Sequence, residues 1–195
     1  VTVHNYKMVK KNGVGPRAII KLVRSGLVIP KIEEVIKSVE PELPENCPSC
    51  DAHLIWEGDH LICPNKSDCP AQTENTLIHF FKTLGNVDGF GPKVIEKIAN
   101  HGIKHIHEIY QIPKHQFVEF GFGDKTSQNL IDQLQASREI EIEDWRFLAA
   151  FGVTRLAGGN CEKLLQHHAI AEVFEISVED LVKIDGFAQL SAEAI

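Results

Sequence analysis

The side chains best suited to chemistry in this sequence are four cysteines gathered in one short segment. Cys47 and Cys50 form a Cys-x2-Cys pair, and Cys63 and Cys69 form a second pair with five residues between them. Two close pairs of thiolates joined by a short hairpin are typical of tetrahedral zinc, and structural zinc sites are commonly closed by four cysteines. Because a closed site has no open coordination position, we expect a structural Zn²⁺ ion without a catalytic role.

Two disulfides or unpaired thiols are the alternative for these four cysteines. A segment of about 25 residues cannot bury a hydrophobic core of its own, so metal is the expected source of its folding free energy. His53 and His60 lie nearby, but neither stands at a ligand-pair offset, and we expect both at the surface. Cys161 stands beside Leu164 and Leu165 in a helical pattern and is expected in a core.

A second pattern is a hairpin that recurs before helical stretches. It reads Gly-Phe-Gly at 89–91 and 121–123, Arg-Leu-Ala at 155–157 and Gly-Phe-Ala at 186–188. Its last residues are 32, 34 and 31 positions apart, and this even period predicts four copies of one unit. Asp124 is the expected N-cap of the second following helix. The helices expected after the four hairpins cover residues 92–100, 124–137, 160–166 and 191–195.

The hairpins suit phosphate binding by the main chain. Their glycines permit positive φ and close approach to a ligand, while free N–H groups at the start of the next helix face an anion. Such contacts hold a DNA backbone without reading bases. If instead each glycine were only a turn or a helix cap, four copies in register would be unexpected. The candidate DNA-binding residues are Gly89, Gly91, Lys93, Gly121, Gly123, Lys125, Thr126, Arg155 and Arg24.

The distribution of charge limits how DNA can be held. The net charge is −7, yet residues 1–39 carry eight Lys or Arg and only two acidic residues. Most of the chain therefore cannot bind DNA through diffuse electrostatic attraction alone. Local N–H donors would have to provide the contacts to DNA. The fourth hairpin is surrounded by acidic side chains and is expected to be scaffold. These acidic residues are Glu172, Glu175, Glu179, Asp180 and Asp185.

Composition divides the chain into three expected domains. Residues 1–40 read mostly as strands, including 1–3, 18–23 and the run to 36. Residues 41–74 hold the cysteines after a proline-rich acidic connector, and residues 75–195 read as helices. The fold class is therefore multidomain and mainly α. The longest apolar runs are too short for a membrane span, and Trp56 and Trp145 are expected to pack in cores.

Several of these segments together resemble one family. Thr2-Val3-His4-Asn5 and Arg24–Pro30 resemble the end of the oligonucleotide-binding (OB) fold of bacterial and phage NAD-dependent DNA ligases. Cys47-Pro48-Ser49-Cys50 and Cys69-Pro70-Ala71-Gln72 resemble the zinc finger of that family, and the first two hairpins follow in the same order. The resemblance implies a partial OB-fold β segment, a four-cysteine zinc finger and helix-hairpin-helix repeats.

The same resemblance implies the function. In that family these modules clamp nicked duplex DNA while an upstream nucleotidyltransferase domain passes AMP from NAD to a lysine and then to the 5′-phosphate. We therefore expect the DNA-binding portion of a ligase of replication and repair, cytoplasmic and associated with the nucleoid. Its partners would be duplex or nicked DNA of any sequence and the upstream domain of the same protein. NAD would act only through that domain, so no residue here is expected to be catalytic and the chain alone should be inactive.

Two departures from the family pattern weaken parts of this interpretation. Leu27 stands where the family generally has Asp, and Ala157 replaces a hairpin glycine, which weakens the third phosphate site. One alternative is a stand-alone DNA-repair module with the same repeats and no ligase activity. Another is a zinc-ribbon interaction module of transcription, in which the hairpin glycines would be incidental.

Overall fold

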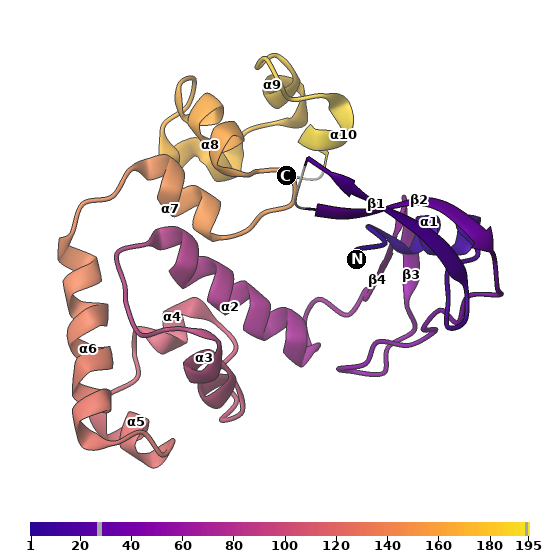
Figure 1. Cartoon of the computed structure of the whole chain (residues 1–195). Helices are drawn as coiled ribbons and strands as arrows, with labels where there is room; N and C mark the ends of the chain where they lie inside the picture. The colour runs from indigo at the N-terminus through magenta and orange to yellow at the C-terminus, as the bar shows by residue number, and fades with distance from the viewer. Residues whose placement is uncertain (27–28, 194) are drawn as a thin grey trace. The chain divides into compact units, whose positions relative to one another are not determined.

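The computed structural model of the chain describes residues 1–26, 29–193 and 195. It divides into two compact units, residues 1–69 and 70–195. Figure 1 shows small antiparallel sheets and one helix in the first unit, and helices throughout the described part of the second. The mainly helical class expected from the sequence is confirmed. Leu27 and Val28 of the OB-like motif, and Ala194 of the last expected helix, lie outside the described residues.

The first unit begins with a helix where strands were expected. Helix α1 covers Tyr6–Asn12, and residues 1–3 are not in a strand, so the expectation of strands was wrong for this segment. The side chain of Asn5 caps the helix by accepting a hydrogen bond of 2.9 Å from the N–H of Met8. Gly13 ends it in a left-handed conformation with φ 62°. The N-cap residue and the C-terminal glycine favour a helix in this segment, and they outweigh the strand preference of the β-branched residues nearby.

Two antiparallel strand pairs follow. Strand β1 (Ile19–Ser25) pairs with β2 (Ile29–Lys37), and β3 (Ile55–Glu57) pairs with β4 (His60–Ile62). The β3–β4 turn uses Gly58 at φ 59°, a conformation that glycine adopts without strain. Helix α1 contacts β4, and the N–H of Lys7 donates to the carbonyl oxygen of Asp59 in the β3–β4 turn over 3.3 Å. The helix and the second hairpin therefore form one surface.

The second unit carries the expected helical repeats. Three of the four expected helices, α3, α6 and α8, match the predictions to within two residues, and α10 is shorter than expected. Among the described residues, no helix combines the length and apolar character needed to cross a membrane. The helices are α2 (Pro70–Leu84), α3 (Pro92–Ala99), α4 (Ile106–Ile109), α5 (Lys114–Glu119), α6 (Asp124–Glu139), α7 (Asp144–Ala150), α8 (Gly158–Leu165), the 3₁₀ helix η1 (Ile170–Glu175), α9 (Val178–Val182) and α10 (Gln189–Ala192).

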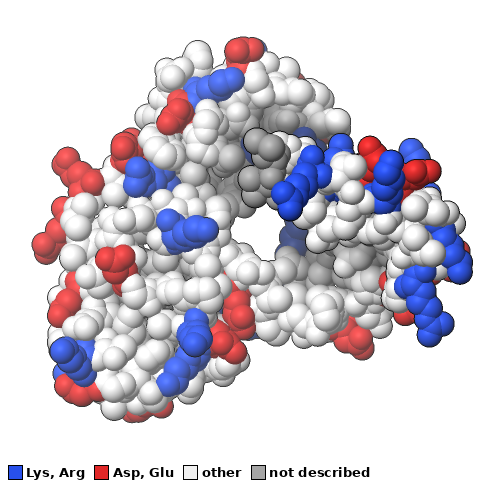
Figure 2. All heavy atoms as spheres, in the orientation of Figure 1, with Lys and Arg blue, Asp and Glu red and all other residues white. Residues whose placement is uncertain are grey.

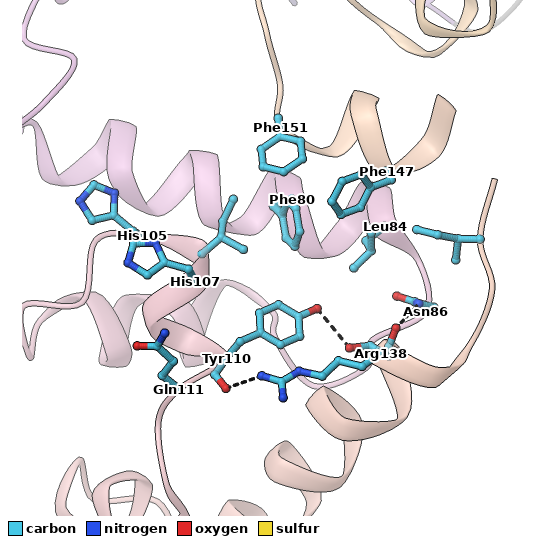
Figure 3. Close-up of a pocket in the computed structure, with 13 residues that line it drawn as sticks. Phe80, Leu84, Asn86, His105, His107, Tyr110, Gln111, Arg138, Phe147 and Phe151 are labelled. Atoms are coloured by element: carbon cyan, nitrogen blue, oxygen red, sulfur yellow. Dashed lines mark hydrogen bonds between the residues drawn. The ribbon is translucent and has the colours of Figure 1, made fainter. Parts of the chain in front are cut away.

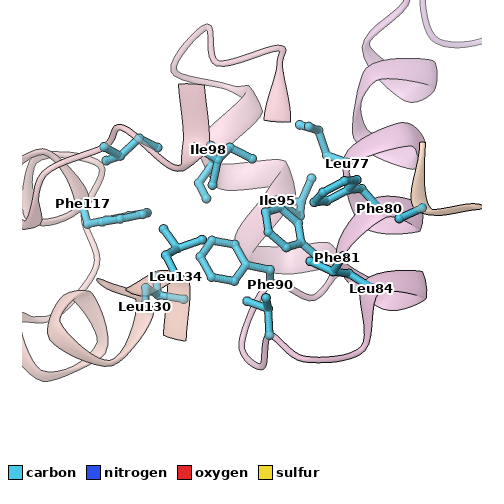
Figure 4. Packing of buried hydrophobic residues seen from close by; sticks show 14 of the residues in the cluster. Leu77, Phe80, Phe81, Leu84, Phe90, Ile95, Ile98, Phe117, Leu130 and Leu134 are labelled. Carbon is cyan, nitrogen blue, oxygen red and sulfur yellow. The ribbon is translucent and has the colours of Figure 1, made fainter. Parts of the chain in front are cut away.

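Two hydrophobic clusters hold this unit together. The first joins α2, α3 and α6 and contains Phe81 stacked on Phe90 with ring centroids 4.5 Å apart (Figure 4). The second joins α7, α8 and α9 and contains Cys161, which is completely buried as expected. The middle residues of three hairpins, Phe90, Leu156 and Phe187, are buried in these clusters. These three hairpins are thus anchored by their central side chains, and Phe122 of the second is half-buried against the first cluster. The two flanking residues of each hairpin are exposed.

Candidate nucleic-acid interface and metal centre

The structure brings the four expected metal ligands together. Cys47 and Cys50 lie in a tight turn in which the N–H of Asp51 donates to the carbonyl oxygen of Cys47 over 2.9 Å. Cys63 follows β4, and Cys69 immediately precedes Pro70, the first residue of α2. The described residues contain no disulfide, so the alternative of two disulfides finds no support. Neither His53 nor His60 belongs to the cluster.

The spacing of the sulfur atoms fits one zinc ion. A tetrahedral zinc about 2.3 Å from each sulfur places neighbouring sulfurs about 3.8 Å apart. The Sγ atoms of Cys47 and Cys69 are 3.9 Å apart, those of Cys50 and Cys63 are 3.5 Å apart, and all four lie within 4.8 Å of one another. The four thiols could therefore close a coordination sphere without rearrangement of the backbone.

Two of the thiols have opposite pKa shifts. Hydrogen bonds from the backbone N–H groups of Ser49 and Cys50 lower the pKa of Cys47 to about 7. Burial raises the pKa of Cys63 to about 11. Because the thiolate is the metal-binding form, Cys47 is poised to receive a metal near neutral pH, whereas metal must displace a proton from Cys63.

The four hairpins share one backbone conformation. The first flanking residue is left-handed in every copy, with φ 91° at Gly89, 81° at Gly121, 65° at Arg155 and 98° at Gly186. A left-handed conformation is unusual for a non-glycine residue such as Arg155, which shows that the third hairpin keeps the geometry without its glycine. The repeat inferred from spacing is therefore a repeat of conformation as well.

The second flanking residue has a different role from the one expected. We expected Gly91 and Gly123 to need positive φ, and that was wrong, because their φ values are −78° and −65°. Ala157 and Ala188 take the same extended conformation. A Cβ atom added at Gly91 or Gly123 would meet nothing within 4 Å. The small residue therefore leaves open space beside the helix start, which a ligand backbone could occupy.

The helix N-termini that follow the hairpins lack side-chain caps. Gly91, Gly123 and Ala157 are the N-cap residues of α3, α6 and α8, and none provides a cap hydrogen bond. Asp124 is the first residue of α6 and not its N-cap, so that expectation was wrong. The first N–H groups of a helix have no acceptor within it, and they carry the positive end of the helix dipole. These three helix starts therefore present main-chain N–H groups of the kind that can bind an anion.

The expected side chains surround these helix starts. Lys93, Lys125 and Thr126 are exposed in the first turns of α3 and α6, and Arg155 is exposed in the third hairpin. Arg24 lies in the other unit, where it is exposed on β1 opposite Pro30. The structure thus places the expected residues of each hairpin beside its helix start, and Arg24 belongs to the first unit.

Sequence reasoning missed Lys97, which contacts the second hairpin from the helix that follows the first. Its Nζ donates to the carbonyl oxygen of Gly121 over 2.6 Å and lies 4.7 Å from the ring centroid of Phe122. Lys163 has a similar place near the fourth hairpin, because a Cβ on Gly186 would lie 2.7 Å from its Nζ. Both lysines stand on the helix after an odd-numbered hairpin and reach the next one. Only that parallel in the repeats could have revealed them.

Replacement of Lys97 by methionine is expected to loosen the second hairpin. The change removes a hydrogen bond from a charged donor, which at a partly exposed site costs about 1 kcal/mol of unfolding free energy. Chemical denaturation measures this loss, with Lys82→Met on the exposed side of α2 as a matched control. Lys97→Arg should recover most of the lost stability. Equal effects of Lys97→Met and Lys82→Met would contradict a role for the contact.

Acidic and basic side chains also meet beside the second hairpin. Asp124 forms an ion pair of 3.0 Å with Lys114, the first residue of α5. Its carboxylate is largely exposed and would repel a phosphate at the start of α6 unless it were neutralised. Lys114 therefore keeps this helix start from carrying a net negative charge.

We expected no lysine of this chain to be followed by x-Asp-Gly, and that was wrong just before the fourth hairpin. Lys183-Ile184-Asp185-Gly186 has the Lys-x-Asp-Gly order that marks the adenylated lysine in the family named above. Here Lys183 is the C-cap of α9 and forms an ion pair of 2.7 Å with Asp180, and Gly186 is the left-handed hairpin residue. The tetrapeptide thus leads from α9 into the fourth hairpin.

A cavity of the second unit lies apart from the expected contact residues. It has a volume of about 780 Å³, and aromatic rings line it: Phe80 of α2, Phe147 of α7 and Phe151, which follows α7 (Figure 3). Its polar groups bind one another, since Arg138 donates to the carbonyl oxygen of Tyr110 over 2.8 Å. None of the candidate DNA-binding residues lines it. The cavity therefore belongs to helix packing rather than to the hairpin surfaces.

The two tryptophans have different environments. Trp145 packs against the second hydrophobic cluster, as expected. Trp56 was expected in a core, and that was wrong, because 45% of its surface is exposed on β3. A hairpin of three-residue strands provides too little cover to bury an indole.

Part of the second unit matches a known protein family. A family model described as "SAM-like Helix-hairpin-helix tandem" matches residues 81–136. This range includes the first two hairpins and the helices α3 to α6. The third and fourth hairpins lie beyond the matched range, and their place in the repeat rests on the conformations described above.

Curated relatives extend along the whole chain. A "DNA ligase" of Psychromonas ingrahamii is 75% identical over 194 residues, and one of Shewanella baltica is 71% identical over 195 residues. A "DNA ligase" of Ruthia magnifica is 47% identical over 194 residues. Each alignment covers 100% of this chain, and the chain spans 30%, 30% and 32% of these relatives.

Proposed function

Because this chain is homologous over its whole length to part of the bacterial DNA ligases, we propose that it is the DNA-gripping portion of an NAD-dependent ligase. It holds nicked duplex DNA through phosphate contacts while a nucleotidyltransferase domain of the same protein seals the nick. The work belongs to replication and repair, in the cytoplasm at the nucleoid. The three-domain division at 40 and 74 remains part of this proposal.

The observation that carries the proposal is the conformation common to the hairpins. Left-handed residues at 89, 121 and 155 precede helix starts without a side-chain cap. At the first two of these helix starts, a Cβ added to Gly91 or Gly123 would meet nothing within 4 Å. Main-chain N–H groups so arranged bind anions of the DNA backbone without regard to base sequence. Helix α10 has only four residues and develops little dipole, so the fourth hairpin serves as scaffold.

The cysteine cluster contributes structure to this function. A zinc ion on Cys47, Cys50, Cys63 and Cys69 would supply folding free energy to a segment with few buried side chains. With four thiolates the ion would have no position left for water or substrate. NAD would be bound by the nucleotidyltransferase domain, and no residue of this chain is assigned to it.

Substitution of the exposed lysines tests the proposal. Lys93→Ala and Lys125→Ala are each expected to weaken duplex binding a few-fold and to lower the slope of log affinity against log salt by about one. Lys183→Ala, just before the fourth hairpin, is the control with the same change of charge and should leave the slope unchanged. Titration of two duplexes of unrelated sequence measures both quantities. Unchanged slopes for Lys93→Ala and Lys125→Ala would contradict phosphate contacts by these two lysines.

The relatives favour a ligase over a stand-alone repair module. Ligation assays with the complete protein distinguish the two, because the stand-alone module would bind nicked DNA without sealing it. The 195-residue chain alone is expected to bind DNA and to leave the nick open. Sealing by the chain alone would contradict the assignment of nucleotidyl transfer to another domain.

A further inference from the structure

A concave surface of the first unit is lined by lysines and one aromatic ring. It has a volume of about 450 Å³, and the residues around it are Lys7, Lys10, Lys11, Trp56 and Gly58. None of them belongs to the four hairpins that precede helices in the second unit, or to the cysteine cluster. We call it the Lys-Trp surface.

The sequence builds this surface from two elements. Lys7, Lys10 and Lys11 are at helical spacings of three and four in α1, so they share one face. The β3–β4 hairpin presents Trp56 to that face. Lys7 joins the elements, because its Nζ forms an ion pair of 2.6 Å with Asp59 in the hairpin turn.

The side chains of the Lys-Trp surface are in part available to a ligand. Trp56 is 45% exposed, and the Nζ of Lys10 lies 5.8 Å from its ring centroid. Within the described part of the chain, Lys10 and Lys11 form no ion pair. The short β3–β4 hairpin leaves the indole uncovered beside the two ammonium groups, so its exposed apolar surface is available to a ligand.

Charge along the chain adds to this observation. Residues 1–39 carry eight Lys or Arg against two acidic residues, within a chain of net charge −7. Figure 2 shows Lys and Arg side chains spread over the first unit, on the face it presents. The positive potential of the chain is therefore concentrated in the segment that holds α1.

We propose that the Lys-Trp surface binds an unpaired stretch of polynucleotide, with phosphates on Lys10 and Lys11 and a base stacked on Trp56. Aromatic rings beside lysines are the usual platform for single strands, because every base has a face to stack. An acidic peptide would satisfy the lysines but would make no use of the indole. A duplex would satisfy the lysines too, but its bases are stacked on each other and unavailable except at ends. The proposal adds to the proposed DNA binding a contact of a different kind.

Fluorescence of Trp56 provides the test. The chain has two tryptophans, so Trp145→Phe leaves Trp56 as the single reporter. A single-stranded oligonucleotide of about 12 nucleotides is titrated into this variant of the 195-residue chain, prepared with zinc. We expect saturable quenching of Trp56 emission that added salt reverses. An oligonucleotide that binds without quenching would overturn the proposal.

Substitutions in the same background separate stacking from charge. Trp56→Ala, followed by fluorescence anisotropy of a labelled oligonucleotide, should weaken binding about tenfold, and Trp56→Phe should recover part of the loss. Lys10→Ala with Lys11→Ala should reduce the salt slope by about 0.7 for each lysine. Lys31→Ala with Lys37→Ala, on exposed positions of β2, is the control with the same change of charge and should leave the slope unchanged. Circular dichroism and zinc content establish that each variant is folded.

Two further results decide between occupants and between proposals. Equal quenching by polyglutamate would show an acidic-peptide site and overturn the assignment to nucleic acid. In a Gly91→Val and Gly123→Val background, duplex affinity should fall while quenching by the single strand persists. Loss of quenching there would mean that the hairpins hold the single strand, which overturns the Lys-Trp surface and leaves the proposed function intact.

Discussion

Gly91→Val and Gly123→Val are each expected to reduce duplex affinity about ten- to a hundredfold while the helices remain folded. Valine accepts the φ values of −78° and −65° at these positions, and its Cβ would meet nothing within 4 Å. Its methyl groups would instead fill the space beside the helix start. Loss of one or two hydrogen bonds to a charged phosphate, at about 1.5–3 kcal/mol each, accounts for the expected loss.

Glycines of the same hairpins with positive φ provide the contrast. Gly121→Val would force valine to φ 81° and place its Cβ 3.2 Å from the Nζ of Lys97, so it should destabilise the fold. Gly186→Val should unsettle the fourth hairpin but spare the affinity of the protein that remains folded. Duplex titration together with circular dichroism measures both effects. If Gly186→Val lost binding while Gly91→Val and Gly123→Val kept it, the assignment of the hairpins would be reversed.

Removal of zinc is expected to unfold the cysteine segment of the first unit. Metal analysis should find one zinc per chain, and Cys69→Ser should lose it, because Cys69 is almost fully buried within the cluster. Zinc binding to such sites supplies roughly 10–16 kcal/mol at neutral pH, more than a segment of this size gains from burial. Cys161→Ala, which removes a buried thiol from the other unit, should leave the zinc content unchanged.

The pH dependence of zinc binding follows from the thiol pKa values. Because burial raises the pKa of Cys63 to about 11, zinc competes with a proton for this sulfur at neutral pH. Zinc affinity should therefore fall as pH falls, and zinc binding should release protons. Titration of a chelator against the protein at several pH values measures this trend. Affinity independent of pH, or a disulfide between Cys47 and Cys50, would rule out the thiolate site.

Much of the fold could be read from local sequence. The resemblance to DNA ligases, carried by cysteine and hairpin motifs, is confirmed by relatives up to 75% identical. Helices α3, α6 and α8 were predicted because glycine hairpins and apolar periodicity agree over each of them. The residues that carry these patterns lie within about ten positions of one another, and sequence patterns predict structure best over such short ranges.

The errors arose where the structure depends on residues far apart or on the finer backbone. Lys97 contacts a carbonyl 24 residues away, and no local pattern marks that contact. The exposure of Trp56 depends on how little the short β3–β4 hairpin covers it. At positions 91 and 123 the sequence pattern indicated that a small residue is needed. It did not indicate whether the need comes from a positive φ or from the space beside the helix start. Helix α1 was missed because strand-like residues on both sides outweighed its cap.

The hairpin surfaces have a consequence for how this protein can vary. A backbone amide neither titrates nor oxidises, and it is present whichever side chain a residue carries. A grip made of amides therefore depends on chain path alone, and Arg155 shows that even a glycine can be exchanged while the path is kept. The side chains of such a surface can change during evolution, to more or fewer acidic residues, while the main-chain contacts to the ligand are kept. That freedom is consistent with the proposed binding of a polyanion by a chain of net charge −7.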